Sequence, residues 1–206
     1  MSVIPDSVKK VRAHKWGNLR PVLLEVAEAL LAERGVDGFS LRETARRAGV
    51  SPAAHAYYFK DTRAILTAIA VRAFRDLGER LRQATEDAGP DRDAAIRAQA
   101  RAYVTFAYSE QARFDLMWRR GVLDPEDPDF VKTANETFQQ LDRIIRGEDA
   151  DICKNSDPAL APSIGWWSLV HGFSMLLNEG VLGEPEMMAD VMLPAMLDRF
   201  LLDEKG

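Results

Sequence analysis

Apolar residues recur at helical spacing along nearly the whole chain, and no stretch alternates apolar and polar residues as a half-buried strand does. One such pattern covers residues 19–34 and ends at Gly35, and a longer one covers residues 62–88 and ends at Gly89 and Pro90. Acidic residues able to cap later helices follow at Asp91, Asp127, Asp157 and Glu184. The pattern predicts an all-α fold of about nine helices without strands.

Two short helices are expected between the first helix and the long one, over residues 41–48 and 52–59. Ser40 and Glu43 have the spacing of a capping box, in which each side chain accepts a hydrogen bond from the other residue's backbone N–H. Ser51 can cap the second helix, and Gly49 permits a left-handed turn between the two. These are the dimensions of a helix-turn-helix, whose second helix enters the major groove of DNA.

The net charge of −5 is unevenly distributed along the chain. Residues 1–63 hold 11 Lys/Arg and 7 Asp/Glu, a net charge of +4, whereas the remaining residues hold 16 and 25, a net charge of −9. A basic N-terminal part on an acidic body is typical of a protein of which only one end meets phosphate. A sequence-independent nucleoid protein, the rival DNA-binding class, is expected to be basic throughout.

Composition argues against several other classes of protein. Hydrophobic residues make up 47% of the chain and charged residues 29%, the balance of a globular domain. The longest nearly apolar run, residues 165–177, is shorter than a bilayer span, and no signal peptide is apparent, so a cytoplasmic protein without a membrane partner is expected. Cys153 stands alone, which excludes an internal disulfide and a multi-cysteine metal site, and a redox role for it is the less favoured interpretation.

An enzyme is the main rival interpretation, and the sequence does not favour it. The chain has no glycine-rich phosphate loop and no nucleophile elbow, and its 3 histidines lie in separate segments. We therefore expect no catalytic residues, no metal site and no cofactor.

The N-terminal motif resembles the DNA-binding domain of TetR-type transcriptional regulators. The matching positions are Leu24-x-x-Ala27, Ala32–Gly35, Ser40–Ala45, Ala48–Ser51 and Phe59. Further positions resemble the branch of that family with a WHG-type C-terminal domain: Gly17-Asn18-Leu19-Arg20, Tyr103-Val104-x-Phe106-Ala107, Phe114-x-Leu116-Met117 and Trp167-x-x-x-His171-Gly172.

The resemblance implies three parts: a basic arm over residues 1–18, a helix-turn-helix domain over 19–63, and a C-terminal effector-binding and dimerisation domain over 64–206. It also implies a homodimeric regulator that binds a palindromic double-stranded DNA operator and is released by a small-molecule effector. A repressor is favoured over an activator because most relatives repress by covering promoter DNA.

Candidate DNA-contacting residues lie in and around the motif. Arg42, at the start of the first short helix, is the candidate for a guanine contact, because residues 52–59 include no Arg, Asn or Gln for bidentate contact with a base. Ala53 and Ala54 are candidates for contact with thymine methyl groups. The remaining candidates are Asn18, Ser40, Ser51, Pro52, Tyr57, Tyr58 and Lys60.

The sequence departs from the family pattern at four positions. Ala56 stands where the family usually has a phosphate-contacting Tyr, and Thr62 where a Lys often reaches phosphate. The adjacent tyrosines, Lys60 and the basic arm are the expected substitutes. Tyr58 stands where His is common, and His55 where Leu packs inward. His55 either packs inward as a neutral imidazole or contacts a base.

A dimer interface is predicted in the last third of the chain. Four small residues follow one another at spacings of four, three and four, which lets helices approach closely: Ala161, Gly165, Ser168 and Gly172. The last helix, residues 186–202, is apolar nearly all round, so we expect it to pack on its own domain and on a second copy, with Met192 and Met196 in the interface. The alternative is a fully buried helix in a monomer.

Aromatic and methionine residues of the acidic body are candidates for the effector pocket, and the expected effector is a small apolar or amphipathic molecule. They are Phe106, Phe114, Met117, Trp118, Trp167, His171 and Met175. The alternative is that each simply belongs to the core. His171 is the candidate polar anchor, or else it forms a hydrogen bond where two subunits meet.

Overall fold

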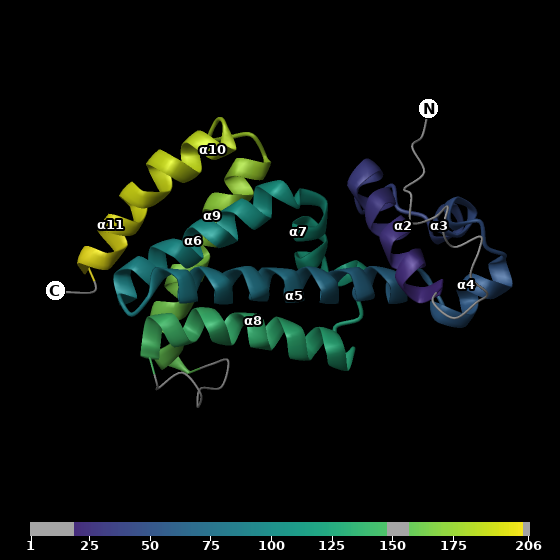
Figure 1. Cartoon of the computed structure of the whole chain (residues 1–206), viewed down its shortest axis with the longest axis horizontal. Coiled ribbons are helices and arrows are strands. Elements are labelled where there is room, and N and C mark those ends of the chain that lie inside the picture. The colour runs from purple at the N-terminus through teal and green to yellow at the C-terminus, as the bar shows by residue number, and fades with distance from the viewer. Residues whose placement is uncertain (1–18, 148–156, 204–206) are drawn as a thin grey trace.

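The computed structural model describes residues 19–147 and 157–203, and every regular element in these ranges is helical. An N-terminal unit is formed by α2 (Leu19–Arg34), α3 (Leu41–Ala48) and α4 (Pro52–Tyr58) and lies at one end of the molecule (Figure 1). The remaining elements form the body: α5 (Thr62–Ala88), α6 (Arg92–Ser109), α7 (Gln111–Trp118), η1 (Arg120–Val122), α8 (Pro128–Arg146), η3 (Pro158–Leu160), α9 (Ala161–Asn178), α10 (Pro185–Met187), η4 (Met188–Met192) and α11 (Leu193–Asp203). The predicted all-α class is confirmed for the described ranges.

Some sequence predictions fall outside the part of the chain that the structure describes. These are the basic arm with Asn18, the loop with Cys153, and the side chains of Pro52 and Ala53.

Acidic side chains cap four helices of the body, and three of these caps are at the predicted residues Asp91, Asp127 and Asp157. Asp61 Oδ1 accepts a hydrogen bond from the backbone N–H of Ala64 at 2.8 Å, which starts α5. The carboxylates of Asp91, Asp127 and Asp157 do the same at the starts of α6, α8 and η3. Such caps contribute about 1 kcal/mol each to stability. Glu184, by contrast, forms no side-chain cap at the start of α10.

The helix predicted to follow Asp91 is interrupted, which the apolar pattern did not indicate. The backbone of Glu110 is non-helical, with φ −121° and ψ 35°, so α6 ends at Ser109 and α7 starts a new direction. Asn178 Nδ2 donates to the Ala107 carbonyl at 3.1 Å, and Gln111 Nε2 donates to the Asn178 carbonyl at 3.2 Å. These bonds with α9 satisfy part of the polar backbone that the break exposes.

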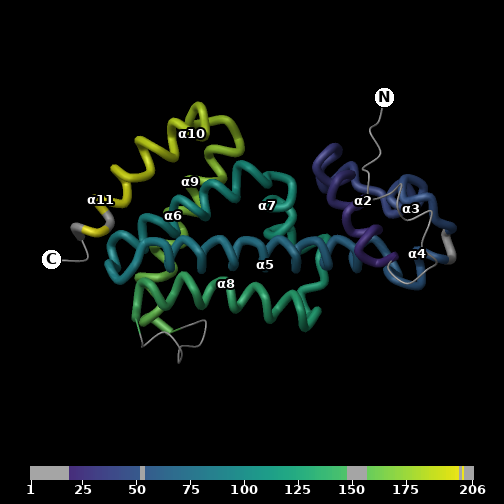
Figure 2. Tube along the Cα trace, in the orientation of Figure 1, coloured from purple at the N-terminus to yellow at the C-terminus, as the bar shows by residue number. Residues whose placement is uncertain are grey.

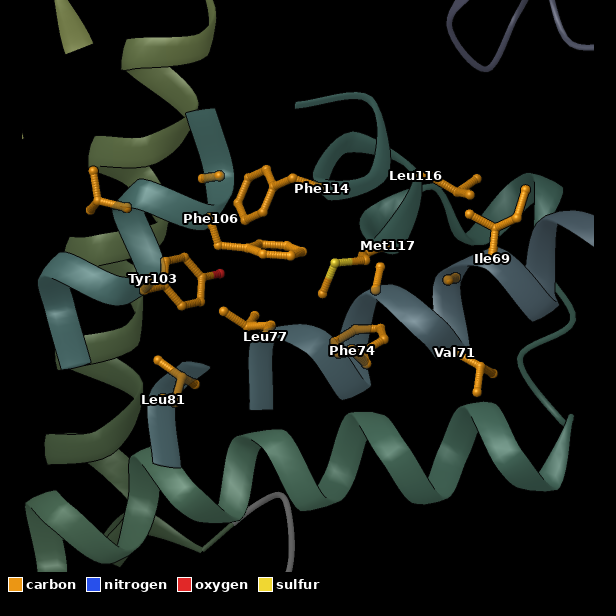
Figure 3. Packing of buried hydrophobic residues seen from close by; sticks show 14 of the residues in the cluster. Ile69, Val71, Phe74, Leu77, Leu81, Tyr103, Phe106, Phe114, Leu116 and Met117 are labelled. Atoms are coloured by element: carbon orange, nitrogen blue, oxygen red, sulfur yellow. The ribbon is translucent and has the colours of Figure 1, made fainter. Parts of the chain in front are cut away.

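The long helix α5 is the element on which the others pack. It leaves the N-terminal unit and runs through the body between α6 and α8 (Figure 2). Its predicted apolar stripe is buried: Leu66, Ile69, Ala73, Leu77 and Leu81. Figure 3 shows Phe74, Leu77 and Leu81 of α5 beneath the aromatic side chains of α6 and α7. One core therefore extends from Leu19 in α2 to Leu201 in α11.

Candidate nucleic-acid interface

Short-range hydrogen bonds fix the turn between α3 and α4. Ser40 Oγ accepts a hydrogen bond from the N–H of Glu43 at 3.3 Å, and Ser51 Oγ accepts one from the N–H of Ala54 at 3.2 Å. Gly49 is left-handed, with φ 70° and ψ 30°, as its place in the turn requires. Because the serine oxygens accept these bonds, each hydroxyl hydrogen is available to donate to another group, such as a phosphate oxygen.

The capping box forms only in one direction. Instead of turning back to Ser40, the Glu43 carboxylate accepts hydrogen bonds from Arg46 Nε at 2.7 Å and from Arg47 Nε at 2.9 Å. These two bonds lower the pKa of Glu43 to about 2. Arg47 also donates to Glu33 on α2 at 2.5 and 3.1 Å, so this group of charges joins α3 to α2.

The arginines of α3 differ in whether an acidic side chain of the protein pairs with them. Arg42 is exposed, and within the described ranges it has neither an ion-pair partner nor a hydrogen-bond partner. It lies in the first turn of α3, where the helix dipole disfavours a cation, so its position does not stabilise the fold. Lys60, just after α4, is likewise exposed and without a partner in the described part of the chain. Both side chains are therefore available to an external anion.

Arg20 is a third available cation, and the sequence analysis did not select it. Its guanidinium carbon lies 5.3 Å from the ring centroid of Phe59, the residue that ends α4, and its side chain lines one cleft with Lys60. No local pattern could have indicated this proximity, because 39 positions separate Arg20 from Phe59 and only the packing of α2 on the end of α4 brings them together.

The exposed face of α4 carries one large side chain. Tyr57 is 83% exposed, and its ring contacts that of Tyr58 edge to face at a centroid distance of 5.0 Å. Ala56, where the family usually has Tyr, is exposed as well. His55 is partly buried, and its Nδ1 is buried without a hydrogen-bond partner, which favours the inward interpretation of this residue.

Two clefts lie between the N-terminal unit and the body. One, of about 480 Å³, runs beside α2 and the start of α5 and includes Arg20, Lys60 and Arg63. The other, of about 750 Å³, lies between α2 and the α6–α7 turn and includes Glu28 and Arg113. Burial raises the pKa of Glu28. None of the residues predicted for the effector pocket lines either cleft.

The predicted effector residues lie together inside the body as a packed group of rings. Phe106, Phe114 and Met117 are buried in the core. Trp118, Trp167 and His171 are partly exposed, and their ring centroids lie 4.7 to 5.9 Å apart. We call these three residues the aromatic triad. Met175 packs against the core nearby and is partly exposed.

Tyr103 lies next to the aromatic triad, and sequence reasoning did not name it as a site residue. The Trp167 indole N–H donates to the Tyr103 hydroxyl at 3.2 Å, and this hydroxyl is 2.9 Å from His171 Nδ1. Burial raises the pKa of Tyr103 and lowers that of His171, so both side chains are uncharged near neutral pH. Tyr103 precedes Phe106 by three positions on α6, but only the packing of α9 on α6 brings it to His171.

The residues predicted for the dimer interface lie on the outside of α9 and of the final helical segment. Ala161, Gly165 and Ser168 are exposed, and Gly172 and Met196 are partly exposed. Met192 is 44% exposed. Apolar residues that sequence reasoning did not place in the interface add to this surface: Ile164, Leu176, Met187 and Val191.

Metal chemistry has no support in residues 19–147 and 157–203, which hold no cluster of His, Cys, Asp or Glu able to bind a metal ion. Among the described helices, none has both the length and the apolar character required to cross a bilayer.

Two family descriptions match the chain. Residues 23–69 match the family described as "Bacterial regulatory proteins, tetR family", and residues 96–200 match "Tetracyclin repressor-like, C-terminal domain". No curated protein matches the sequence.

Solved structures with the same fold cover nearly the whole chain. A protein of unknown function from Rhodococcus sp. RHA1 is 33% identical, with a TM-score of 0.77 over 92% of this chain and 96% of that one. PfmR, a TetR family transcriptional regulator from Thermus thermophilus, is 24% identical, with a TM-score of 0.63 over 87% and 93%. NalD, the secondary repressor of the MexAB-OprM multidrug efflux pump in Pseudomonas aeruginosa, is 19% identical, with a TM-score of 0.58 over 88% and 94%. The two more distant structures establish the fold alone.

The difference between paired and unpaired arginines predicts a difference in DNA binding. Arg42→Ala is expected to weaken binding to the preferred DNA site by ~1–3 kcal/mol at fixed salt, the range for a bidentate guanine contact. Arg46→Ala is the matched control, since Arg46 is also exposed on α3 but is bonded to Glu43. Fluorescence anisotropy with labelled duplexes measures both variants. Unchanged binding by Arg42→Ala, or equal losses in the two variants, would contradict the assignment.

Proposed function

The chain belongs to the tetR family of bacterial regulatory proteins, and from this premise we propose that it is a repressor that a small effector releases from a palindromic operator. Regulators of this family bind DNA, act as dimers and are not enzymes. The observation that carries the proposal is α5, which belongs to one core with both the N-terminal unit and the body. A change of packing in the body therefore moves the DNA-binding unit.

The proposed DNA-binding surface combines the available cations with the exposed face of α4. Arg42 contacts guanine, and Lys60 and Arg20 contact phosphate. Tyr57 donates its hydroxyl to the DNA backbone and so replaces the phosphate-contacting tyrosine that the family usually has at the position of Ala56. The serine caps, Ala54 and the arm with Asn18 complete the surface. Arg42 and Lys60 are exposed and have no internal partner among the residues that the structure describes, which supports these roles for them.

We assign the same three parts as the sequence indicated: an arm over residues 1–18, a DNA-binding domain over 19–63, and an effector-binding and dimerisation domain over 64–206. The second boundary falls in the first turn of α5, so the two domains share that helix. A protein that acts on bacterial DNA belongs in the cytoplasm, where we place it.

The dimer we propose pairs α9 and the final helical segment with the same elements of a second copy. Small residues on α9 permit close approach, and exposed side chains such as Ile164, Leu176 and Val191 supply apolar area that a monomer leaves in water. A two-fold axis through this surface presents two α4 helices to two half-sites.

Gly165→Leu tests that surface. A Cβ atom added at Gly165, which is exposed on α9, meets nothing within 4 Å in its own chain, so we expect the single subunit to accommodate leucine and a second copy to be obstructed by it. Sedimentation equilibrium is expected to show a dimer for the natural sequence and a monomer for the variant at micromolar concentration. Operator affinity falls at least about tenfold, because one half-site is lost.

Gln83→Leu is the control, since it adds the same side chain at an exposed position of α5 outside the proposed interface. A dimeric Gly165→Leu protein with full operator affinity would place the interface elsewhere. Loss of helix cannot explain a monomer, since leucine favours a helix interior over glycine by roughly 1 kcal/mol.

Repression itself is tested with a reporter whose promoter overlaps the preferred DNA site. Expression of the protein is expected to lower reporter output, and Arg42→Ala is expected to restore it. An increase in output with the natural sequence would identify an activator and contradict the proposal.

A further inference from the structure

The hydrogen bonds around Tyr103 favour one tautomer of His171. An indole nitrogen can only donate, so Trp167 Nε1–H uses the Tyr103 oxygen as its acceptor. The Tyr103 hydroxyl has one proton, and its other neighbour in hydrogen-bond contact is His171 Nδ1 at 2.9 Å. If Nδ1 were protonated, the proton of this buried hydroxyl would have no acceptor among the described residues, so the hydroxyl is assigned as the donor to Nδ1. A neutral imidazole that accepts at Nδ1 carries its proton on Nε2.

The resulting Nε2–H is a donor without an acceptor. It has no hydrogen-bond partner in the described ranges, and it is not one of the atoms there that are both buried and unpartnered, so it keeps some exposure to solvent. Trp118 Nε1–H, in the same triad, is buried and also has no partner in the described part of the chain. The triad thus offers two unmatched donors and no unmatched acceptor, which favours a ligand that brings acceptor atoms.

The ring of His171 faces the body rather than the exposed side of α9. Its centroid lies 4.7 Å from that of Trp118 and 5.5 Å from that of Phe114, both on α7, and its Nδ1 contacts Tyr103 on α6. These contacts direct the ring toward α6 and α7. A ligand that accepts from Nε2–H is therefore favoured over a partner subunit.

The surroundings indicate an uncharged, flat ligand. The ring contacts and hydrogen bonds of the aromatic triad involve no charged side chain in residues 19–147 and 157–203. The two arginines over the neighbouring Phe106 ring, Arg80 and Arg113, are already paired with Glu110 and Asp76, so neither is a free counter-ion for an anion. Trp118 and Trp167 are partly exposed, with centroids 5.5 Å apart and planes inclined by 46°. Indole faces in such a group pack best on another planar ring.

We propose that the effector is an uncharged planar aromatic molecule whose carbonyl-type oxygen accepts a hydrogen bond from His171 Nε2–H while its ring packs on Trp118 and Trp167. This assignment rests on the proposed function, because that function requires an effector and the assignment specifies the chemistry of this effector. Tyr103 acts through His171: it is a positioning residue that holds the imidazole in the donating tautomer.

Three naphthalene probes test the ligand chemistry on the full-length protein. They share one ring system and differ in the substituent: β-acetonaphthone has a carbonyl, β-isopropylnaphthalene is its hydrocarbon counterpart, and β-naphthoate is an anion. Quenching of tryptophan fluorescence gives each affinity. The ketone is expected to bind roughly three- to tenfold more tightly than the hydrocarbon, the contribution of one hydrogen bond, and more tightly than the anion. Equal binding of ketone and hydrocarbon, preference for the anion, or no binding of any probe would overturn the proposal.

Two variants assign the preference to His171. His171→Leu is expected to abolish the preference for the ketone, whereas His171→Gln, which keeps a terminal N–H donor, is expected to retain it. Both are expected to remain dimers with full operator affinity. A monomeric His171→Leu protein would place His171 where two subunits meet and overturn the ligand assignment.

Nitrogen NMR of the ring reports the tautomer directly, and Tyr103→Phe is the control. The natural sequence is expected to show a protonated Nε2 and a bare Nδ1, and removal of the Tyr103 hydroxyl is expected to produce a mixture. A protonated Nδ1 in the natural sequence would overturn the assignment.

A measurement of operator release by each probe distinguishes a failure of this inference from a failure of the proposed function. Release of the operator by the ketone supports both. Binding of the ketone without release supports the ligand chemistry and contradicts effector-driven release. Release by other compounds when no probe binds supports the function and overturns the ligand class.

Discussion

The burial of one face of α5 along its length, and of most of its first half, is the constraint on which the rest of the molecule depends. The helix packs on α2 at its start and on α6, α7 and α8 along the body, so neither end can shift without disturbing the other. Tightly packed interiors move between discrete arrangements rather than deform continuously. Phe74 of α5 contacts Trp118 of the aromatic triad. Because α5 is shared, we expect a change of packing near Phe74 to move the DNA-binding unit.

Charge pairing decides which residues of the DNA-binding unit serve the fold and which are available for function. Arg46 and Arg47 would count as DNA contacts in any tally of positive charge, yet both are bonded to Glu43, and Arg47 also to Glu33. Arg42 has no such partner in the described ranges and lies where the helix dipole disfavours it. A cation that the fold neither pairs nor needs is the one we expect DNA to pair.

The parts of the structure that depend on local chemistry could be predicted from the sequence. Caps such as Ser40 and Asp127, and the glycine turn at Gly49, act over a few residues and give the helix bounds closely. Contacts between distant segments could not be predicted, because no short-range pattern specifies them. The bond from Tyr103 to His171 spans 68 positions, and the break at Glu110 depends on contacts with α9.

Selection of bound DNA from a random pool by the full-length protein tests most directly whether the chain is a sequence-specific dimeric regulator. The account predicts enrichment of a single palindrome, with half-sites about one helical turn or a multiple of it apart, each contacted by one α3–α4 unit. Enrichment of no sequence, or of a single half-site without symmetry, would contradict it.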